Sequence, residues 1–209
     1  MVSGRYRYLL DGVEVPVREE FTVIGDGPEV RVESWREAGE IRIDVEAGWV
    51  GGLLHATVAW RSPLLERRRS FEADPETSLF PLMRVFAGPV LLAARAATVV
   101  DGGVVGGGRR VLVPDVRDPA DIDHLLDPLV DVRTAVTIDE AVEVEGAQRP
   151  AVRLEYRGGS YAETGAAFDV DTEGLLLGYG WDQPGAGRWQ VRLTDLDGPP
   201  PRPLRWGSP

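Results

Sequence analysis

Residues 41–46, Ile-Arg-Ile-Asp-Val-Glu, decide the fold class, because apolar and charged side chains alternate along them. Successive side chains of a β-strand point to opposite faces of the sheet, so this segment places apolar groups on one face and charged groups on the other. The same alternation recurs at residues 30–33, 152–156, 168–171 and 189–193. It predicts a mainly β protein with antiparallel sheet that is wet on one side.

Turn-forming residues separate the strand candidates of the N-terminal half. Asp11-Gly12 is the clearest hairpin signal, because both residues tolerate the positive φ angles of a two-residue hairpin turn. The candidates in this half are residues 5–10, 13–24, 30–36, 41–47, 53–61 and 68–73. Alternation returns at residues 130–144 and 151–193, after a less regular middle. This organisation predicts a curved antiparallel sheet, arranged as a spiral β-roll or a half-barrel.

The middle of the chain carries two helix signals. In residues 78–88, a serine cap, an early proline and a terminal glycine predict a short helix. Residues 118–126 repeat the pattern, with Asp118 as the cap and Pro119 at the first helical position. The apolar stretch 89–100 fits either a strand or a helix, and periodicity does not distinguish them. We therefore expect one or two short helices beside the sheet.

Length and composition favour a single domain. A chain of 209 residues with 43% hydrophobic residues buries enough surface for one core, expected over residues 1–196. The proline-rich residues 197–209 predict an extended tail. The sequence contains no cysteine, which excludes disulfides and thiolate chemistry. It shows no stretch of signal-peptide or membrane-span length, so we expect a cytoplasmic protein without an integral membrane segment.

Net charge restricts the possible partners, and amino-acid composition indicates the kind of genome. The net charge of −11 argues against nucleic acid as a partner, since phosphates need a concentrated basic face. The main local exception, Arg67-Arg68-Arg69, is typical of a solvated strand face. Lysine and asparagine do not occur, whereas arginine, alanine and glycine are abundant, which indicates a bacterial origin with a GC-rich genome.

No residue cluster predicts catalysis, a metal or a cofactor. His55 and His124 are the two histidines, too few for a three-histidine zinc site, and no Gly-x-Ser-x-Gly motif occurs. The aspartates of residues 115–127 match no calcium loop, and the glycines at 106–108 lack the lysine of a phosphate-binding loop. We expect no catalytic residues. The alternative is a carboxylate-based hydrolase that uses Asp169 and Asp171, two positions on one strand face.

Aromatic and apolar residues are more numerous than a surface connector requires. Six tryptophans accompany the apolar run of residues 80–97, and such a set either closes a core or lines a pocket for an acyl chain. If a pocket exists, Arg84 is the candidate contact for the polar head group of the ligand. The candidate ligand-binding residues are Phe80, Met83, Arg84, Phe86, Leu91, Trp60 and Trp181.

Two motifs resemble a bacterial glycolipid-binding family whose fold is a spiral β-roll. Residues 80–85, Phe-Pro-Leu-Met-Arg-Val, are similar to that family's Leu-Pro-Ile-Arg-Arg-Leu segment. Residues 168–179 are similar to its closing strand pair, which ends in tyrosine. The polar Thr-Asn pair before the first motif is replaced by Glu76-Thr77-Ser78, and the family's tryptophan-led N-terminal opening is absent. The resemblance covers about half of the chain and implies a β-roll that binds a glycolipid.

The leading hypothesis is non-enzymatic binding of an apolar or glycolipid-like ligand within a curved β-sheet. The alternative from another class is a protein-interaction or structural module with a filled core, which holds a partner or forms a homodimer through a sheet edge or the proline-rich tail. Fold analogy by itself does not choose between these classes.

Overall fold

The computed structural model describes residues 1–25, 30–50, 53–73, 78–79, 98–100, 103–105, 109–113, 129–157, 165, 167–171 and 176–198. Its strands are β1 (Val2–Leu10), β2 (Val13–Ile24), β3 (Val30–Ala38), β4 (Ile41–Val50), β5 (Leu53–Arg61), β6 (Glu66–Ala73), β7 (Ser78–Leu79), β8 (Thr98–Val100), β9 (Gly103–Val105), β10 (Arg109–Val113), β11 (Leu129–Val144), β12 (Ala147–Arg157), β13 (Ala167–Asp171), β14 (Leu176–Gln183) and β15 (Gly187–Asp197).

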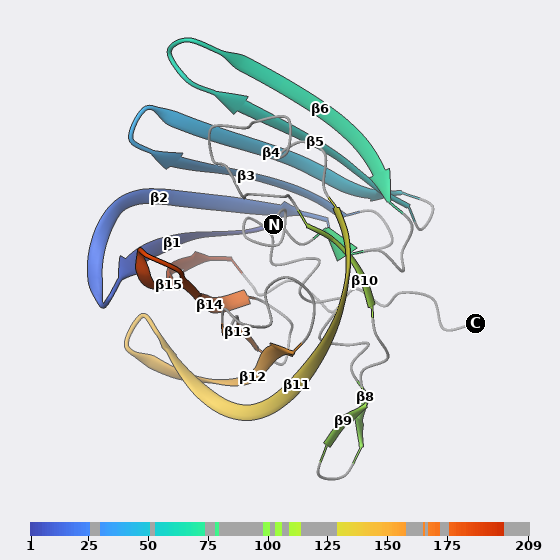
Figure 1. The fold of residues 1–209 in the computed structure, drawn as a ribbon, viewed down its shortest axis with the longest axis vertical. Coiled ribbons are helices and arrows are strands. Elements are labelled where there is room, and N and C mark those ends of the chain that lie inside the picture. Colours follow the sequence, from blue (N-terminus) through green and yellow to red (C-terminus); the bar gives the residue numbers. More distant parts are fainter. Residues whose placement is uncertain are drawn as a thin grey trace.

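One curled sheet holds thirteen of these strands, in the order β6-β5-β4-β3-β2-β1-β15-β14-β13-β12-β11-β10-β7. Laid flat, it would separate β6 from β7 by about 58 Å, at about 4.8 Å per strand. The chain from Ala73 to Ser78 spans at most about 18 Å. The sheet must therefore bend back on itself, and Figure 1 shows the long strand β11 curving round toward the far end of β6.

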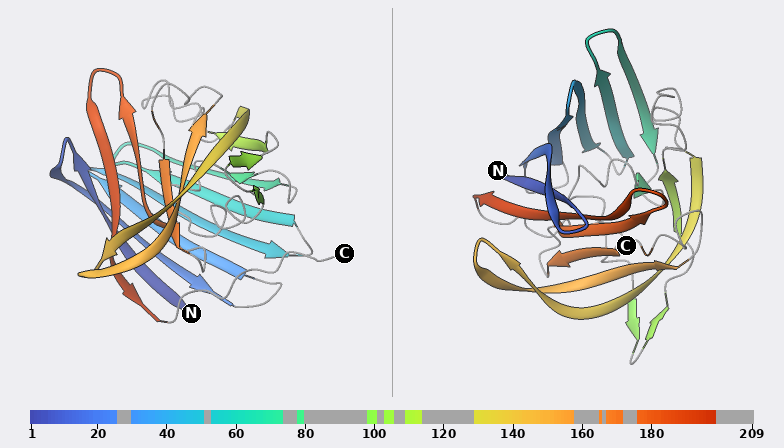
Figure 2. Two further views of the ribbon diagram at one scale, coloured as in Figure 1. Left: turned by 90° about the horizontal axis from the view of Figure 1, so that it is seen from below. Right: turned by 60° about the vertical axis from the view of Figure 1, so that its left-hand side comes forward.

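The ladders confirm the predicted curved antiparallel sheet. Among the described strands, every ladder is antiparallel except the short pairing of β7 with β10. The N-terminal strands β1–β6 form a regular meander, and Figure 2 shows β11 and β12 crossing their direction. The sheet is thus continuous, and the N-terminal and C-terminal parts join where β1 pairs with β15.

Register divides the sheet into two faces. We call the side that bears Tyr6, Phe21, Val32, Val45 and Val191 the apolar face, and these side chains are 0–3% exposed. Because register partners share a face, the alternate residues form the other side, which we call the charged face. The alternation read from residues 41–46 therefore predicts the two faces correctly, although of its apolar residues only Val45 is buried, while Ile43 is half-buried and Ile41 is 38% exposed.

Local chemistry explains where the strands turn and kink. Asp11 and Gly12 have φ angles of 50° and 80°, which confirms the predicted hairpin. The β1–β2 register then jumps from Arg7↔Arg18 to Tyr8↔Val15. Pro16 lies within this irregularity, where its missing N–H costs no ladder hydrogen bond.

The β11–β12 hairpin folds over the charged face near β15. Its turn, Glu145-Gly146, again has positive φ angles, and Glu145 Oε1 accepts a hydrogen bond from the Leu196 backbone N–H at 3.2 Å. Val142 and Val144 lie on the charged face but are 7% and 2% exposed. They are buried because the C-terminal part of the sheet curls more tightly than the N-terminal part.

The predicted helices are not found among the described residues. Ser78 and Leu79, the expected start of the first helix, instead form β7, whose partners in β10 are Val111 and Leu112. The edge of β10 supplies hydrogen-bond partners for the backbone of Ser78 and Leu79. Sequence periodicity could not reveal this partner strand. The rest of that segment and residues 118–126 lie outside the described residues. At its end the apolar stretch 89–100 is a strand, since β8 pairs with β9.

We expect Gly4→Ala to destabilise the fold by about 1–3 kcal/mol. A Cβ at Gly4 would lie 2.6 Å from two ring atoms of the buried Phe21, so that ring would have to move. Urea unfolding measures the effect, and Ser3→Ala on the charged face is the control. An unchanged midpoint for Gly4→Ala would show that Phe21 has room to relax.

Candidate functional site

One row of directly opposed residues crosses the apolar face. From β5 to β15 it runs Trp60, Ile43, Arg36, Glu19, Tyr6 and Leu193. Two charged residues thus stand in the middle of an otherwise apolar row. Buried charges are costly unless they are paired and hydrogen-bonded, so this pair is the first place to look for function.

Glu19 anchors a buried hydrogen-bond network. Its side chain is 0% exposed, and Glu19 Oε2 accepts a short hydrogen bond from the Tyr8 hydroxyl. Because the Tyr8 hydroxyl donates its proton to Glu19, the Tyr179 hydroxyl is the donor in the hydrogen bond to Tyr8 Oη, at 2.9 Å. The neighbouring Tyr6 hydroxyl donates to the Leu176 carbonyl at 2.8 Å. The network therefore ties β1 and β2 to β14.

Electrostatics keeps Tyr6 and Tyr8 neutral and Arg36 charged. Burial, and then the Glu19 carboxylate, raise the pKa of Tyr6 and of Tyr8 well above the usual value for tyrosine, so both remain neutral donors. For Arg36, burial opposes the charged form, but Tyr8, Tyr179 and Glu19 outweigh it and the pKa is raised. Arg36 is therefore the fixed positive charge opposite Glu19.

The apolar face opens toward β5. Glu19 and Tyr6 are buried, whereas Arg36, Ile43 and Trp60, the next residues of the row, are half-buried. Beside them, Val58 is half-buried too, although its partner Val45 is only 3% exposed. The row ends at Arg67 on the edge strand β6, which is directly opposite Trp60 and exposed. Solvent thus reaches an apolar surface that has an arginine on each side.

Trp181 belongs to an aromatic stack at the other side of the network. Its ring lies parallel to Tyr179 and Trp189, with centroid distances of 5.8 and 5.7 Å. Register places Trp181 and Trp60 on the same face, six strand positions apart along the sheet. The described structure therefore does not show these two predicted ligand-binding residues in one cluster.

The other predicted ligand-binding residues lie outside the described residues. They are Phe80, Met83, Arg84, Phe86 and Leu91. The head-group role of Arg84 remains a prediction. Sequence reasoning missed Glu19, Tyr8 and Arg36, because their contacts join strands whose register no local pattern reveals.

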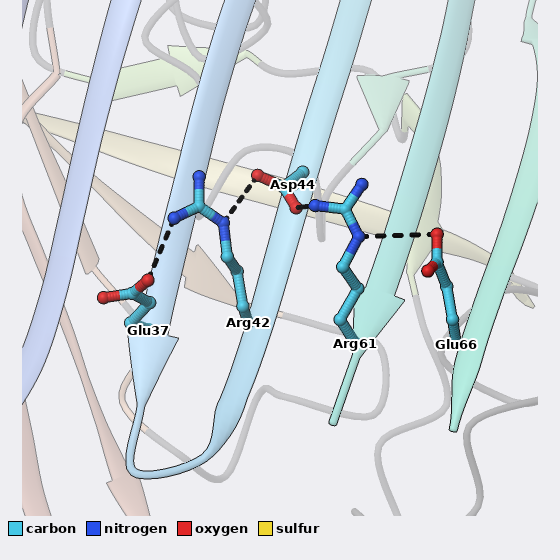
Figure 3. A network of polar contacts seen from close by, with 5 residues as sticks. All are labelled: Glu37, Arg42, Asp44, Arg61 and Glu66. Carbon is cyan, nitrogen blue, oxygen red and sulfur yellow. Dashed lines mark hydrogen bonds and ion pairs between the residues drawn. The ribbon is translucent and has the colours of Figure 1, made fainter. Parts of the chain in front are cut away.

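A hollow of about 750 Å³ lies on the charged face of the N-terminal strands. A ladder of ion pairs crosses it, from Glu37 to Arg42 at 2.9 Å, to Asp44 at 2.9 Å, to Arg61 at 2.6 Å and to Glu66 at 3.4 Å (Figure 3). Each arginine here is shared between two carboxylates, so both positive charges of the ladder are paired. Exposed ion pairs of this kind contribute little to stability individually.

A second polar cluster joins β11, β12, β13 and β15. Asp169 is 3% exposed and accepts hydrogen bonds from Arg153 at 2.8 and 3.2 Å and from Arg192 at 3.0 Å. Arg153 also contacts Glu140 at 3.0 Å. Burial and the neighbouring Asp169 carboxylate raise the pKa of Glu140 to about 7, against the opposing effect of the two arginines.

Gly178 makes this cluster possible. It lies between Asp169 and Arg192 in the cross-strand row, and a Cβ there would be 3.3 Å from Arg192 Nη1. The arginine therefore reaches across β14 because no side chain is in its way. Asp171, the suggested catalytic partner of Asp169, instead contacts Arg149 at 3.8 Å. Asp169 is thus committed to two arginines, which does not favour the hydrolase alternative.

Within the described part of the chain, no group of three or more His, Cys, Asp or Glu residues has the geometry to hold a metal ion. The same residues include no helix with the length and hydropathy of a membrane span.

Comparison with known proteins supports the fold. No family model and no curated protein matches the sequence. A crystal structure of a beta-barrel-like protein of the domain of unknown function DUF1849 from Brucella abortus is similar, with a TM-score of 0.52 and 12% sequence identity. The match covers 94% of this chain and 96% of that chain. The chain therefore has a β-barrel-like fold, and the resemblance to a glycolipid-binding family stays a prediction.

We expect Tyr8→Phe to cost about 2 kcal/mol of unfolding free energy, because it removes a hydrogen bond to a buried carboxylate. Tyr6→Phe is the matched control, since it removes a bond to a neutral carbonyl and should cost about 1 kcal/mol. Urea unfolding compares the two. Equal losses would contradict a special role for Glu19.

Glu140 predicts a pH-dependent stability difference. Its pKa is about 7 in the folded protein and 4.5 in model compounds, so the folded state binds the additional proton, and wild-type stability falls as pH rises through that interval. Glu140→Gln lacks this penalty. It should melt a few degrees above wild type at pH 8 and close to it at pH 5. The exposed Glu143→Gln is the control in scanning calorimetry, and a constant difference for Glu140→Gln across pH would contradict the assignment.

Proposed function

We propose that this protein binds an amphipathic ligand with an apolar chain and an anionic group, on the apolar face where β3–β6 leave it half open. The observation that carries the proposal is the exposure of Trp60, Ile43 and Val58 on a face whose neighbouring positions are almost fully buried. Partly exposed apolar side chains in a curved sheet are typical of a wall for an acyl chain. This develops the apolar or glycolipid-like ligand predicted from the sequence.

Charge specifies the polar end of the ligand. Arg67 is directly opposite Trp60, is exposed, and makes no side-chain ion pair with the described residues. Arg36 lies two strands to the other side of Trp60, but its charge is already balanced by Glu19. An anionic group at the β6 edge would therefore bind Arg67, and the chain would lie along Trp60 and Ile43.

The proposed role is binding without chemistry. Below the wall, hydrogen bonds join Glu19, Tyr8 and Tyr179, and the charged Arg36 lies directly opposite Glu19. It keeps a rigid base under the ligand wall. A binding role requires that rigidity and no free proton donor or nucleophile.

The test is a fluorescence titration with cis-parinaric acid, a fluorescent fatty acid, and with its methyl ester. We expect the free acid to bind, and Trp60→Leu to weaken binding about tenfold, which corresponds to about 1.4 kcal/mol. Trp35→Leu is the matched control, because Trp35 is half-buried on the charged face. Equal losses from the two variants would count against the apolar face as the site.

A second pair of variants tests the head group. Arg67→Gln should reduce the preference for the acid over the ester, since Arg67 is on the ligand face. Arg68→Gln should leave that preference unchanged, because Arg68 follows on the same strand and lines the hollow on the opposite face. Light scattering accompanies the titration. A dimer that buries Trp60 and binds no fatty acid would overturn the proposal in favour of an interaction module.

A further inference from the structure

A second row of directly opposed residues crosses the charged face, and arginines adjoin one another at its centre. The row runs from β12 to β6 through Arg153, Asp169, Gly178, Arg192, Arg7, Arg18, Glu37, Arg42, Arg61 and Glu66. Arg192, Arg7 and Arg18 are consecutive in it. Like charges placed directly opposite each other destabilise a sheet, so this juxtaposition needs a compensating group.

Most arginines of this face are paired with carboxylates, whereas Arg7 and Arg18 have no such partner among the described residues. Arg192 is bound to Asp169. By contrast, Arg7 and Arg18 are exposed and make no side-chain hydrogen bond or ion pair with the residues that the structure describes. On the same face, Arg5, Arg31, Arg42 and Arg61 each form ion pairs with two carboxylates. Glu37 is directly opposite Arg18, but its side chain forms an ion pair with Arg42, at 2.9 Å.

Arg7 also lines a hollow of about 620 Å³, a volume typical of small-molecule sites. Arg153, Arg192 and Thr194 contribute to its wall. Three carboxylates line it as well. Glu140 is held by Arg153, Glu145 accepts the Leu196 N–H, and Glu143 is exposed at the rim.

We propose that a phosphorylated small molecule binds here, with its body in the hollow against Thr194 and Arg192. Its phosphate group would lie at the edge of the hollow, between Arg7 of the wall and Arg18, which is directly opposite Arg7 on β2. Two guanidinium groups that face each other across adjacent strands offer the paired N–H donors that a phosphate accepts. The phosphate supplies the negative charge that the sheet lacks at this point. The site lies on the opposite face from the proposed amphipathic ligand and does not depend on it.

Isothermal titration calorimetry with glucose 6-phosphate, inorganic phosphate and glucose tests this proposal at constant ionic strength. We expect glucose 6-phosphate and inorganic phosphate to bind and glucose not to bind. Arg7→Gln and Arg18→Gln should each weaken glucose 6-phosphate binding at least about tenfold, as expected for a charge-assisted contact of about 1.4 kcal/mol or more. Arg31→Gln, which removes an equally exposed but paired arginine of the same face, should leave binding unchanged.

Thermal melting supplies an independent readout of the same pair. Without phosphate, Arg7→Gln should melt at or above the wild-type temperature, because it relieves repulsion, and phosphate should stabilise wild type but not the variant. The absence of phosphate binding by wild type, or equal losses for Arg31→Gln and Arg7→Gln, would overturn the proposal. Trp60→Leu should retain phosphate binding, which separates this site from the one on the apolar face.

Discussion

The register between neighbouring strands is the constraint on which the other features of this protein depend. The period of a strand is two residues, so a slip by one would exchange the apolar and charged faces. Here a single sheet carries the register from β6 to β7 through thirteen strands. It brings Trp60 into line with Glu19 on one face, and Arg42 into line with Arg192 on the other. Neither site exists in a single strand or hairpin.

Burial of Glu19 is what gives the apolar face its specific character. A sheet face made only of valine and leucine would tolerate several packing arrangements, whereas a buried carboxylate has to meet its partners. Tyr8 donates a hydrogen bond to that carboxylate and Arg36 is the charge opposite it, while Tyr179 donates to the Tyr8 hydroxyl. The network therefore holds β14 against β1 and β2, and the surface beyond it, at Ile43 and Trp60, stays open without loosening the fold.

On the charged face, the curvature of the sheet decides whether the alternating polar side chains are exposed or buried. On β3–β6 the face is open, and its carboxylates and arginines pair with one another along the ladder of Figure 3. Near β15 the β11–β12 hairpin folds over the same face, so Asp169 and Val144 are almost completely buried. Burial is also the main cause that raises the pKa of Glu140 to about 7. Arg7 and Arg18 lie at the boundary between these two regions, where the pairing pattern is interrupted.

The sequence by itself determined the fold class, the positions of most strands and the Asp11-Gly12 hairpin, because alternation and turn chemistry are local properties. It also determined that the apolar and the charged side chains of residues 41–46 point to opposite faces of the sheet, whereas the tertiary structure decided that only Val45 of the apolar set is buried. Only the tertiary structure decided that Ser78 and Leu79 form a strand, since their partner β10 comes about thirty residues later in the chain. It likewise decided which residues lie opposite Glu19, Gly178 and Arg7. Those neighbours depend on the pairing of strands that are distant in the chain, and the sequence around each residue does not reveal that pairing.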